Sequence, residues 1–278
     1  MKNKDGVIVF GASGLIGKCL YNLFKEKNKP IVGTYHTNKK SELIYFDLEK
    51  SPVDSLNLDN VRYGIICSAV TNLDKCNDNP EYSHSVNVKA AERIVTELSE
   101  KAIVPVFMST GAVFDGVEGG YKENSKRNPV SIYWKQKVEV EEFIFSNIKD
   151  YLIIRPGKVF NFKDLLSDWI KKYKNNETIP CADDEKLSFT SAEDVARGIN
   201  LLLDKDSRGV YHINPLGYAS RFDLISRFFR NMNIKDAKIK RCSIDDFGTK
   251  RAKNTYMDAS KFIKETGFKF TDLDNLLT

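Results

Sequence analysis

The run Gly11-Ala-Ser-Gly14-Leu-Ile-Gly17 lies between two segments of opposite character, and it constrains the fold more than any other feature. Val7-Ile-Val-Phe10 before it is short and apolar, as in a buried strand, and residues 15–27 after it alternate as in an amphipathic helix. Bare glycine backbone lets a pyrophosphate approach, and the free N–H groups and positive dipole end of a helix N-terminus hold it. The sequence therefore predicts a dinucleotide site at the first strand–helix junction.

Short apolar runs and helical patterns alternate through the first half of the chain. Further strands are expected at residues 30–34, 43–46, 63–67, 104–108 and 151–154, and further helices at 80–101 and 130–147. This rhythm predicts an α/β fold, a Rossmann-type doubly wound parallel sheet. The rhythm becomes irregular after Pro156, so we expect a dinucleotide-binding domain at 1–157 and a smaller C-terminal substrate-binding lobe at 158–278, interleaved with late sheet elements.

Composition narrows the classes of partner. Charges of both signs are interspersed and leave a net +5, without the basic block of a nucleic-acid-binding arm. The five cysteines are odd in number and lack metal-ligand spacing, so we expect reduced thiols and no metal. Neither a signal peptide nor a membrane-spanning stretch is visible, which favours a cytoplasmic protein without membrane contact. The sequence leaves a homodimer open.

The glycine spacing resembles the fingerprint of extended short-chain dehydrogenases/reductases. Asp47-Leu48 matches the position where that family places an aspartate at the adenine amino group and a residue packed on the ring. Ser68-Ala69-Val70 matches the loop that lines the cofactor, and Asn87 matches the asparagine that braces the active-site helix. Tyr133-x-x-x-Lys137 corresponds to the family's proton donor and its lysine.

Two further segments narrow the resemblance to one branch. Residues 109–116, Ser109-Thr110-Gly-Ala-Val-Phe-Asp-Gly116, look like the segment Ser-Thr-Asp-Tyr-Val-Phe-Asp-Gly of dTDP-4-dehydrorhamnose reductases. Near the C-terminus, the segment from Arg251 to Lys261 resembles their Arg-Pro-x-Asn segment with its following Leu-Asp. The resemblance covers nearly the whole chain.

The resemblance implies a catalytic set of Thr110, Tyr133 and Lys137. Hydride from a nicotinamide would reach a carbonyl carbon while Tyr133 donates a proton to the oxygen. A free phenol titrates near pH ~10, and we expect the Lys137 ammonium to make it more acidic and also to hold the nicotinamide ribose. Thr110 would bind the carbonyl oxygen, although the strand-end hydroxyl could instead be Ser109; family register favours Thr110.

The second strand is expected to end without an acid. Residues 33–40 offer His36, Lys39 and Lys40, which could pair with a 2′-phosphate, whereas an NAD site usually places Asp or Glu here. NADP(H) is therefore favoured over NAD(H). The expected cofactor-binding residues are Gly11, Ser13, Gly14, Leu15, Ile16, Gly17, His36, Lys39, Asp47, Leu48, Ser68, Ala69, Val70, Tyr133 and Lys137.

The sugar-facing positions depart from the branch. The aspartate and tyrosine after the catalytic threonine are Gly111 and Ala112, and Lys158 replaces a sugar-facing tryptophan. These changes put the exact dehydrorhamnose substrate in doubt but not the reductase class. The expected substrate-binding residues are Asn87, Thr110, Lys158 and Arg251.

The sequence thus predicts an enzyme, an NADP(H)-dependent reductase of a 4-keto deoxysugar nucleotide. One alternative is an NAD-dependent sugar-nucleotide epimerase or dehydratase, but dehydratases carry Thr-Asp-Glu where this chain has Thr110-Gly-Ala. The other is a non-catalytic, cofactor-binding regulatory subunit, as in the methionine adenosyltransferase regulatory subunit of the same branch. The intact set of Thr110, Tyr133 and Lys137 favours the enzyme.

Overall fold

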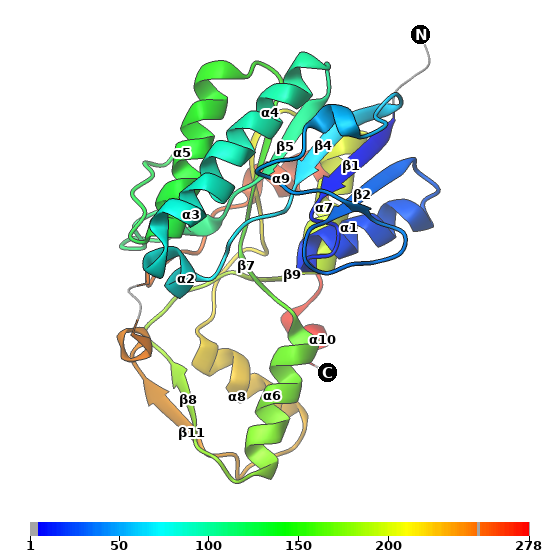
Figure 1. Ribbon diagram of the computed structural model, residues 1–278. Helices are drawn as coiled ribbons and strands as arrows, with labels where there is room; N and C mark the ends of the chain where they lie inside the picture. The colour runs from blue at the N-terminus through cyan, green and yellow to red at the C-terminus, as the bar shows by residue number, and fades with distance from the viewer. Residues whose placement is uncertain (1–4, 249–250, 278) are drawn as a thin grey trace.

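A seven-stranded parallel sheet forms the centre of the protein in the computed structural model, which describes residues 5–248 and 251–277 (Figure 1). Its strand order is β10-β6-β5-β4-β1-β2-β3. The strands are β1 (Gly6–Phe10), β2 (Ile31–Tyr35), β3 (Ile44–Tyr45), β4 (Val61–Ile66), β5 (Val104–Met108), β6 (Leu152–Pro156) and β10 (Gly209–Ile213). The order reverses between β1 and β4, so the loops after these two strands diverge and leave a crevice at their carboxyl ends.

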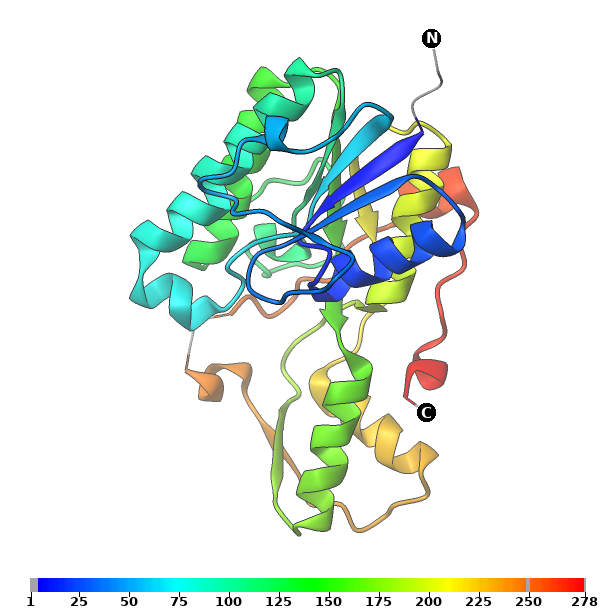
Figure 2. The same ribbon diagram turned by 45° about the vertical axis from the view of Figure 1, so that its right-hand side comes forward.

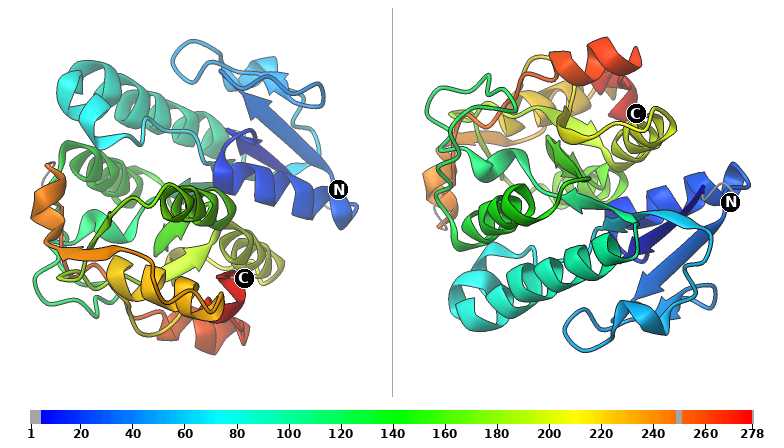
Figure 3. Two further views of the ribbon diagram at one scale, coloured as in Figure 1. Left: turned by 90° about the horizontal axis from the view of Figure 1, so that it is seen from below. Right: turned by 90° about the horizontal axis from the view of Figure 1, so that it is seen from above.

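Helices cover both faces of the sheet, which confirms the predicted doubly wound fold. One face packs α1 (Leu15–Glu26), α7 (Ala192–Asp204) and α9 (Ser260–Thr266) over a core that includes Val9, Leu20 and Ile199. The other face packs α4 (Ala90–Glu100) and α5 (Ile132–Asn147) over a second core that includes Ile8, Ile94 and Val140. The end-on views in Figure 3 show these two helical layers on either side of the strands.

A smaller lobe lies at the carboxyl edge of the sheet, below it in Figures 1 and 2. It contains α6 (Phe162–Lys174), α8 (Arg221–Asn231), α10 (Leu273–Leu276) and the strand pair β8 (Ile179–Ala182) and β11 (Ile239–Cys242). Its own core gathers aromatic residues such as Trp169, Phe228 and Phe229. A short pair, β7 (Lys158–Phe160) with β9 (Phe189–Ser191), lies where the chain passes between the two parts.

The second half of the chain divides between both parts. The predicted division at 157/158 falls just after β6, and α7, β10 and α9 return to the main sheet. The lobe is built from the segments before α7, between β10 and α9, and after α9. The strands β7, β8 and β9 were not predicted, because each is three or four residues long and lacks a clear apolar period. Among the described residues, no helix is long and apolar enough to cross a membrane.

The helix predicted at 80–101 is present but not uniform. It comprises α3 (Pro80–His84), a π-helical turn at Ser85–Lys89 and α4. Apolar spacing does not reveal such a turn, because one extra residue shifts the helical face without ending the helix. π-Turns of this kind frequently occur at functional sites, and this one contains Asn87.

Candidate active site

The glycine loop has the geometry that close packing at a pyrophosphate site requires. Gly11 adopts φ +85°, and a Cβ there would lie 2.2 Å from the Ser68 hydroxyl oxygen. A Cβ on Gly17 would lie 2.2 Å from the Gly11 carbonyl oxygen, so glycine lets the first turn of α1 approach the loop. Gly14 caps α1 with extended backbone and without a side-chain hydrogen bond to the helix, which leaves N–H groups directed at the crevice.

A cavity of about 860 Å³ runs from this loop to the small lobe. It brings together residues from the ends of β1, β2, β4, β5 and β6, as the strand order requires. The predicted residues that line it are Gly11, Ser13, Gly14, Leu15, Ile16, Gly17, His36, Asp47, Leu48, Ser68, Ala69, Val70, Thr110, Tyr133, Lys158 and Arg251. Three others, Lys39, Asn87 and Lys137, are not part of its lining.

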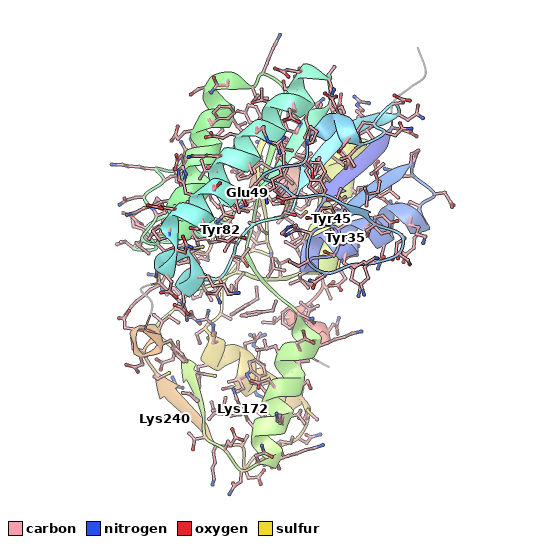
Figure 4. The ribbon with its side chains drawn as sticks, viewed as in Figure 1. Tyr35, Tyr45, Glu49, Tyr82, Lys172 and Lys240 are labelled. Carbon is pink, nitrogen blue, oxygen red and sulfur yellow. The ribbon has the colours of Figure 1, made fainter. Side chains whose placement is uncertain are left out.

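The end of the cavity where the sequence predicts the adenosine is formed by the residues after β2 and β3. His36, Thr37 and Asn38 follow β2, and Nε2 of His36 lies 3.9 Å from Oδ2 of Asp47. Figure 4 shows Tyr35 and Tyr45 at this edge of the sheet and Glu49 nearer the helices. Lys39 is exposed on the loop outside the cavity, so the structure does not bring it to the predicted phosphate position.

Asn87 is buried behind the cavity wall, contrary to the expectation of direct substrate contact. Its Oδ1 accepts from the Val70 amide at 2.7 Å, and its Nδ2 donates to the Val70 carbonyl at 3.0 Å. The same Nδ2 donates to Oε1 of Gln136 at 2.8 Å, and Gln136 donates to the Ser83 hydroxyl. Asn87 therefore holds the cofactor-lining loop against α5, which agrees with its predicted bracing position.

The two hydroxyls at the end of β5 have different surroundings. Ser109 is 6% exposed and donates to Oε1 of Glu141 at 2.5 Å. Oγ1 of Thr110 lies at the cavity and accepts a hydrogen bond from the Ala112 amide at 3.2 Å. Its hydroxyl proton is thus available for a ligand, which supports Thr110 over Ser109 as the residue that would contact substrate.

Tyr133 and Lys137 occupy successive turns of α5. Ser131 caps this helix, and Tyr133 lines the cavity with its side chain partly exposed there. Lys137 is buried, its ammonium donates to the Met108 carbonyl at 2.8 Å, and it lies 5.8 Å from the Tyr133 ring centroid. Lys137 therefore lies behind the tyrosine, and the structure does not show it reaching the space expected for the ribose.

Burial changes the acidity of both groups. It raises the pKa of the Tyr133 phenol, with the nearby Cys76 acting in the same direction, so the net shift is opposite to the acidification expected from the sequence. Burial also lowers the pKa of the Lys137 ammonium to about 8, against the opposing influence of Cys67 and Glu141. At neutral pH the phenol is protonated, as a proton donor must be.

The lobe end of the cavity is rich in positive charge. Lys158, Arg221 and Arg251 line it together with Glu185. Glu185 is buried and bound by Arg221 through the backbone amide and through NH1 at 2.5 Å. Lys158 is open to the cavity, yet the protein around it, and then Arg221 and Arg251, lower the pKa of its ammonium to about 8. With Glu185 committed to Arg221, two cationic side chains remain to face a ligand.

Arg221 and Glu185 were missed in the sequence, as were Trp134, Tyr82 and Glu49, which also line the cavity. Figure 4 shows Glu49 and Tyr82 on the same side of the main domain. Arg221 and Glu185 belong to the irregular half of the chain, where no spacing relates them. Trp134 directly follows the predicted Tyr133 in the sequence, and among the missed residues only this adjacency could have indicated a place at the cavity.

A family model described as "RmlD substrate binding domain" matches residues 5–277. The chain belongs to this family. It is 28% identical to a hypothetical dTDP-4-dehydrorhamnose reductase from Sulfolobus tokodaii, with a TM-score of 0.85 over 96% of this chain and 98% of that one. A Bacillus anthracis dTDP-4-dehydrorhamnose reductase in complex with NADP shares the fold at 24% identity, with a TM-score of 0.81 over 99% and 97%.

A relative of a different kind also aligns over most of the family member's length. Methionine adenosyltransferase 2 subunit beta from Xenopus tropicalis is 24% identical over 271 residues, which is 92% of this chain and 81% of that protein. This chain is thus similar both to proteins named as reductases and to a protein named as a subunit of another enzyme. The residues at the site of this chain must therefore distinguish a reductase from a subunit of another enzyme.

Proposed function

We propose that this protein is an NADP(H)-dependent reductase of a 4-keto deoxysugar nucleotide. The observation that carries the proposal is that three groups of residues line one cavity: the glycine loop, the hydroxyl residues Thr110 and Tyr133, and the cations Lys158 and Arg251. A dinucleotide at the first part and a diphosphate at the third would place a sugar between them, beside the proton donor. The likeness to dTDP-4-dehydrorhamnose reductases supports this function.

The proposed chemistry divides among named residues. The bound nicotinamide supplies hydride to the carbonyl carbon. Thr110 donates a hydrogen bond to the carbonyl oxygen and fixes its direction, and Tyr133 transfers its proton to the developing alkoxide. The Lys137 ammonium, buried behind the ring, stabilises the phenolate that remains.

The preference for NADP(H) is part of the same proposal. His36, Thr37 and Asn38 line the cavity where β2 ends, and no carboxylate follows that strand directly. Nε2 of His36 lies 3.9 Å from Oδ2 of Asp47, and a ring nitrogen of this imidazole could donate a hydrogen bond to a 2′-phosphate. Calorimetric titration should show tighter binding of NADPH than of NADH, with the difference reduced in His36→Ala. Equal affinity for the two cofactors in the wild type would contradict the preference.

The substrate class is tested by measuring NADPH oxidation with a panel of 4-keto sugar nucleotides. The panel should vary the nucleotide and the stereochemistry at carbons 3 and 5 separately. We expect turnover of at least one 4-keto-6-deoxysugar nucleotide and none of the corresponding free sugar, because the free sugar lacks the diphosphate that Lys158 and Arg251 would bind. Equal turnover of both forms would remove the nucleotide from the proposal.

The second candidate is a cofactor-binding regulatory subunit, favoured by the alignment with methionine adenosyltransferase 2 subunit beta. It predicts cofactor binding without any reductase activity in the wild type. Thr110 and Tyr133 at one cavity are more than such a subunit needs, and they support the enzyme.

A further inference from the structure

The end of β5 and the face of α5 are joined residue by residue. Tyr133, Lys137 and Glu141 stand at four-residue spacing on α5 and therefore share one face. Lys137 donates to the Met108 carbonyl at 2.8 Å, and Glu141 accepts from the Ser109 hydroxyl at 2.5 Å. Thr110 comes next in the chain and lines the cavity with Tyr133.

Glu141 is the fixed point of this arrangement. It is fully buried, and its carboxylate accepts hydrogen bonds from Nε of Arg155 at 2.9 Å and from NH2 of Arg155 at 2.6 Å. Arg155 is itself 1% exposed and lies on β6, the strand that pairs with β5. Arg127 adds a hydrogen bond at 3.1 Å from the loop before α5. Glu141 thus binds α5, β6 and the end of β5 at one point.

We propose that Ser109 and Glu141 form a positioning pair that sets the separation of Thr110 and Tyr133. The inference rests on the proposed function, since it assigns these two residues to the geometry of proton transfer. Ser109 lines the cavity, but its hydroxyl donates its proton to Glu141, and Glu141 is fully buried away from the cavity. Their effect reaches the reaction through Thr110, which is covalently next to Ser109, and through Tyr133, two turns from Glu141.

The chain contains a comparison for this bond. Ser207 donates to Oε1 of Glu265 at 2.5 Å and is 7% exposed, against 2.5 Å and 6% for Ser109. The acceptors differ, because Glu265 is exposed and Glu141 is fully buried. Ser207 comes after α7 and Glu265 belongs to α9, on the opposite face of the sheet from α5. Ser109→Ala and Ser207→Ala therefore each remove a bond from a buried serine to a glutamate, one beside the cavity and one far from it.

Three measurements on the full chain test the pair. In Ser109→Ala we expect kcat to fall on the order of tenfold to a hundredfold, because a small misplacement of reacting groups has that effect. Cofactor affinity and KM should change little. Ser207→Ala should leave kcat near the wild-type value and lower the melting temperature less than Ser109→Ala does, because Glu265 is exposed and keeps its hydrogen bond from Tyr211. Amide hydrogen exchange should accelerate at residues 109–113 in Ser109→Ala only.

A merely structural role predicts something else: a loss of kcat in Ser109→Ala that is as small as the loss in Ser207→Ala. That outcome, or unchanged exchange at 109–113 in Ser109→Ala, would overturn the positioning pair. Amide hydrogen exchange needs no substrate. A wild type without reductase activity would therefore contradict the proposed function, while the exchange at residues 109–113 would still test whether Ser109 and Glu141 hold this segment in place. Glu141→Asp, which keeps the charge but withdraws it by one methylene, should reproduce the fall in kcat.

Discussion

Two lysines, Lys137 behind Tyr133 and Lys158 at the cavity, have lowered pKa values. Burial lowers the pKa of Lys137 to about 8, and the protein around Lys158, with Arg221 and Arg251, lowers its pKa to about 8. Each is charged below that pH and becomes neutral as pH rises through it. Cys67 and Glu141 face Lys137, and Arg221, Arg251 and Glu185 face Lys158.

We therefore expect kcat/KM to fall above about pH 8 with a two-proton dependence. Lys158→Gln should raise KM and leave a one-proton dependence, because only Lys137 then titrates in this range. The check is a pH–rate profile of both proteins at saturating NADPH. A flat profile in the wild type up to pH ~10, the ordinary range for lysine, would contradict the assigned roles.

At the scale of elements, the β1–α1 junction depends on glycine for two separate reasons. Gly11 adopts φ +85° and also lacks room for a Cβ, whereas Gly209, at φ +90°, has nothing within 4 Å of the Cβ position. Gly209→Ala should therefore cost about 1–2 kcal/mol from backbone strain alone. Gly11→Ala should cost more, because contact with Ser68 is added to the strain.

The same pair of variants separates strain from cofactor binding. We expect Gly11→Ala to weaken NADPH binding at least tenfold, on the order of 1.4 kcal/mol, because the loop shifts away from the pyrophosphate position. Gly209→Ala should leave the affinity unchanged. Thermal unfolding and calorimetric titration of both variants provide the measurements. Unchanged NADPH affinity in folded Gly11→Ala would exclude this loop as the pyrophosphate site.

At the scale of the whole molecule, local sequence pattern was enough to predict the sheet and the glycine loop at its carboxyl edge. The family resemblance supplied most of the other predicted residues, and most of the predicted residues lie together at the cavity. Arg221 and Glu185 could not be predicted, because they meet the site only after the lobe folds back on the sheet. The positions of Asn87 and Lys137 could not be predicted either, since pattern does not show which side of a wall a side chain occupies.

The central claim is hydride transfer with Tyr133 as the proton donor, because this reaction would use the glycine loop, Thr110 and the cations of the lobe together. Single-turnover NADPH oxidation with a reactive 4-keto sugar nucleotide, in the wild type and in Tyr133→Phe, tests it most directly. We expect measurable oxidation in the wild type and a rate at least about a hundredfold lower in Tyr133→Phe, with NADPH affinity nearly unchanged. Wild-type rates that persist in Tyr133→Phe would contradict the assignment, and a wild type that binds NADPH but never oxidises it would favour the regulatory subunit.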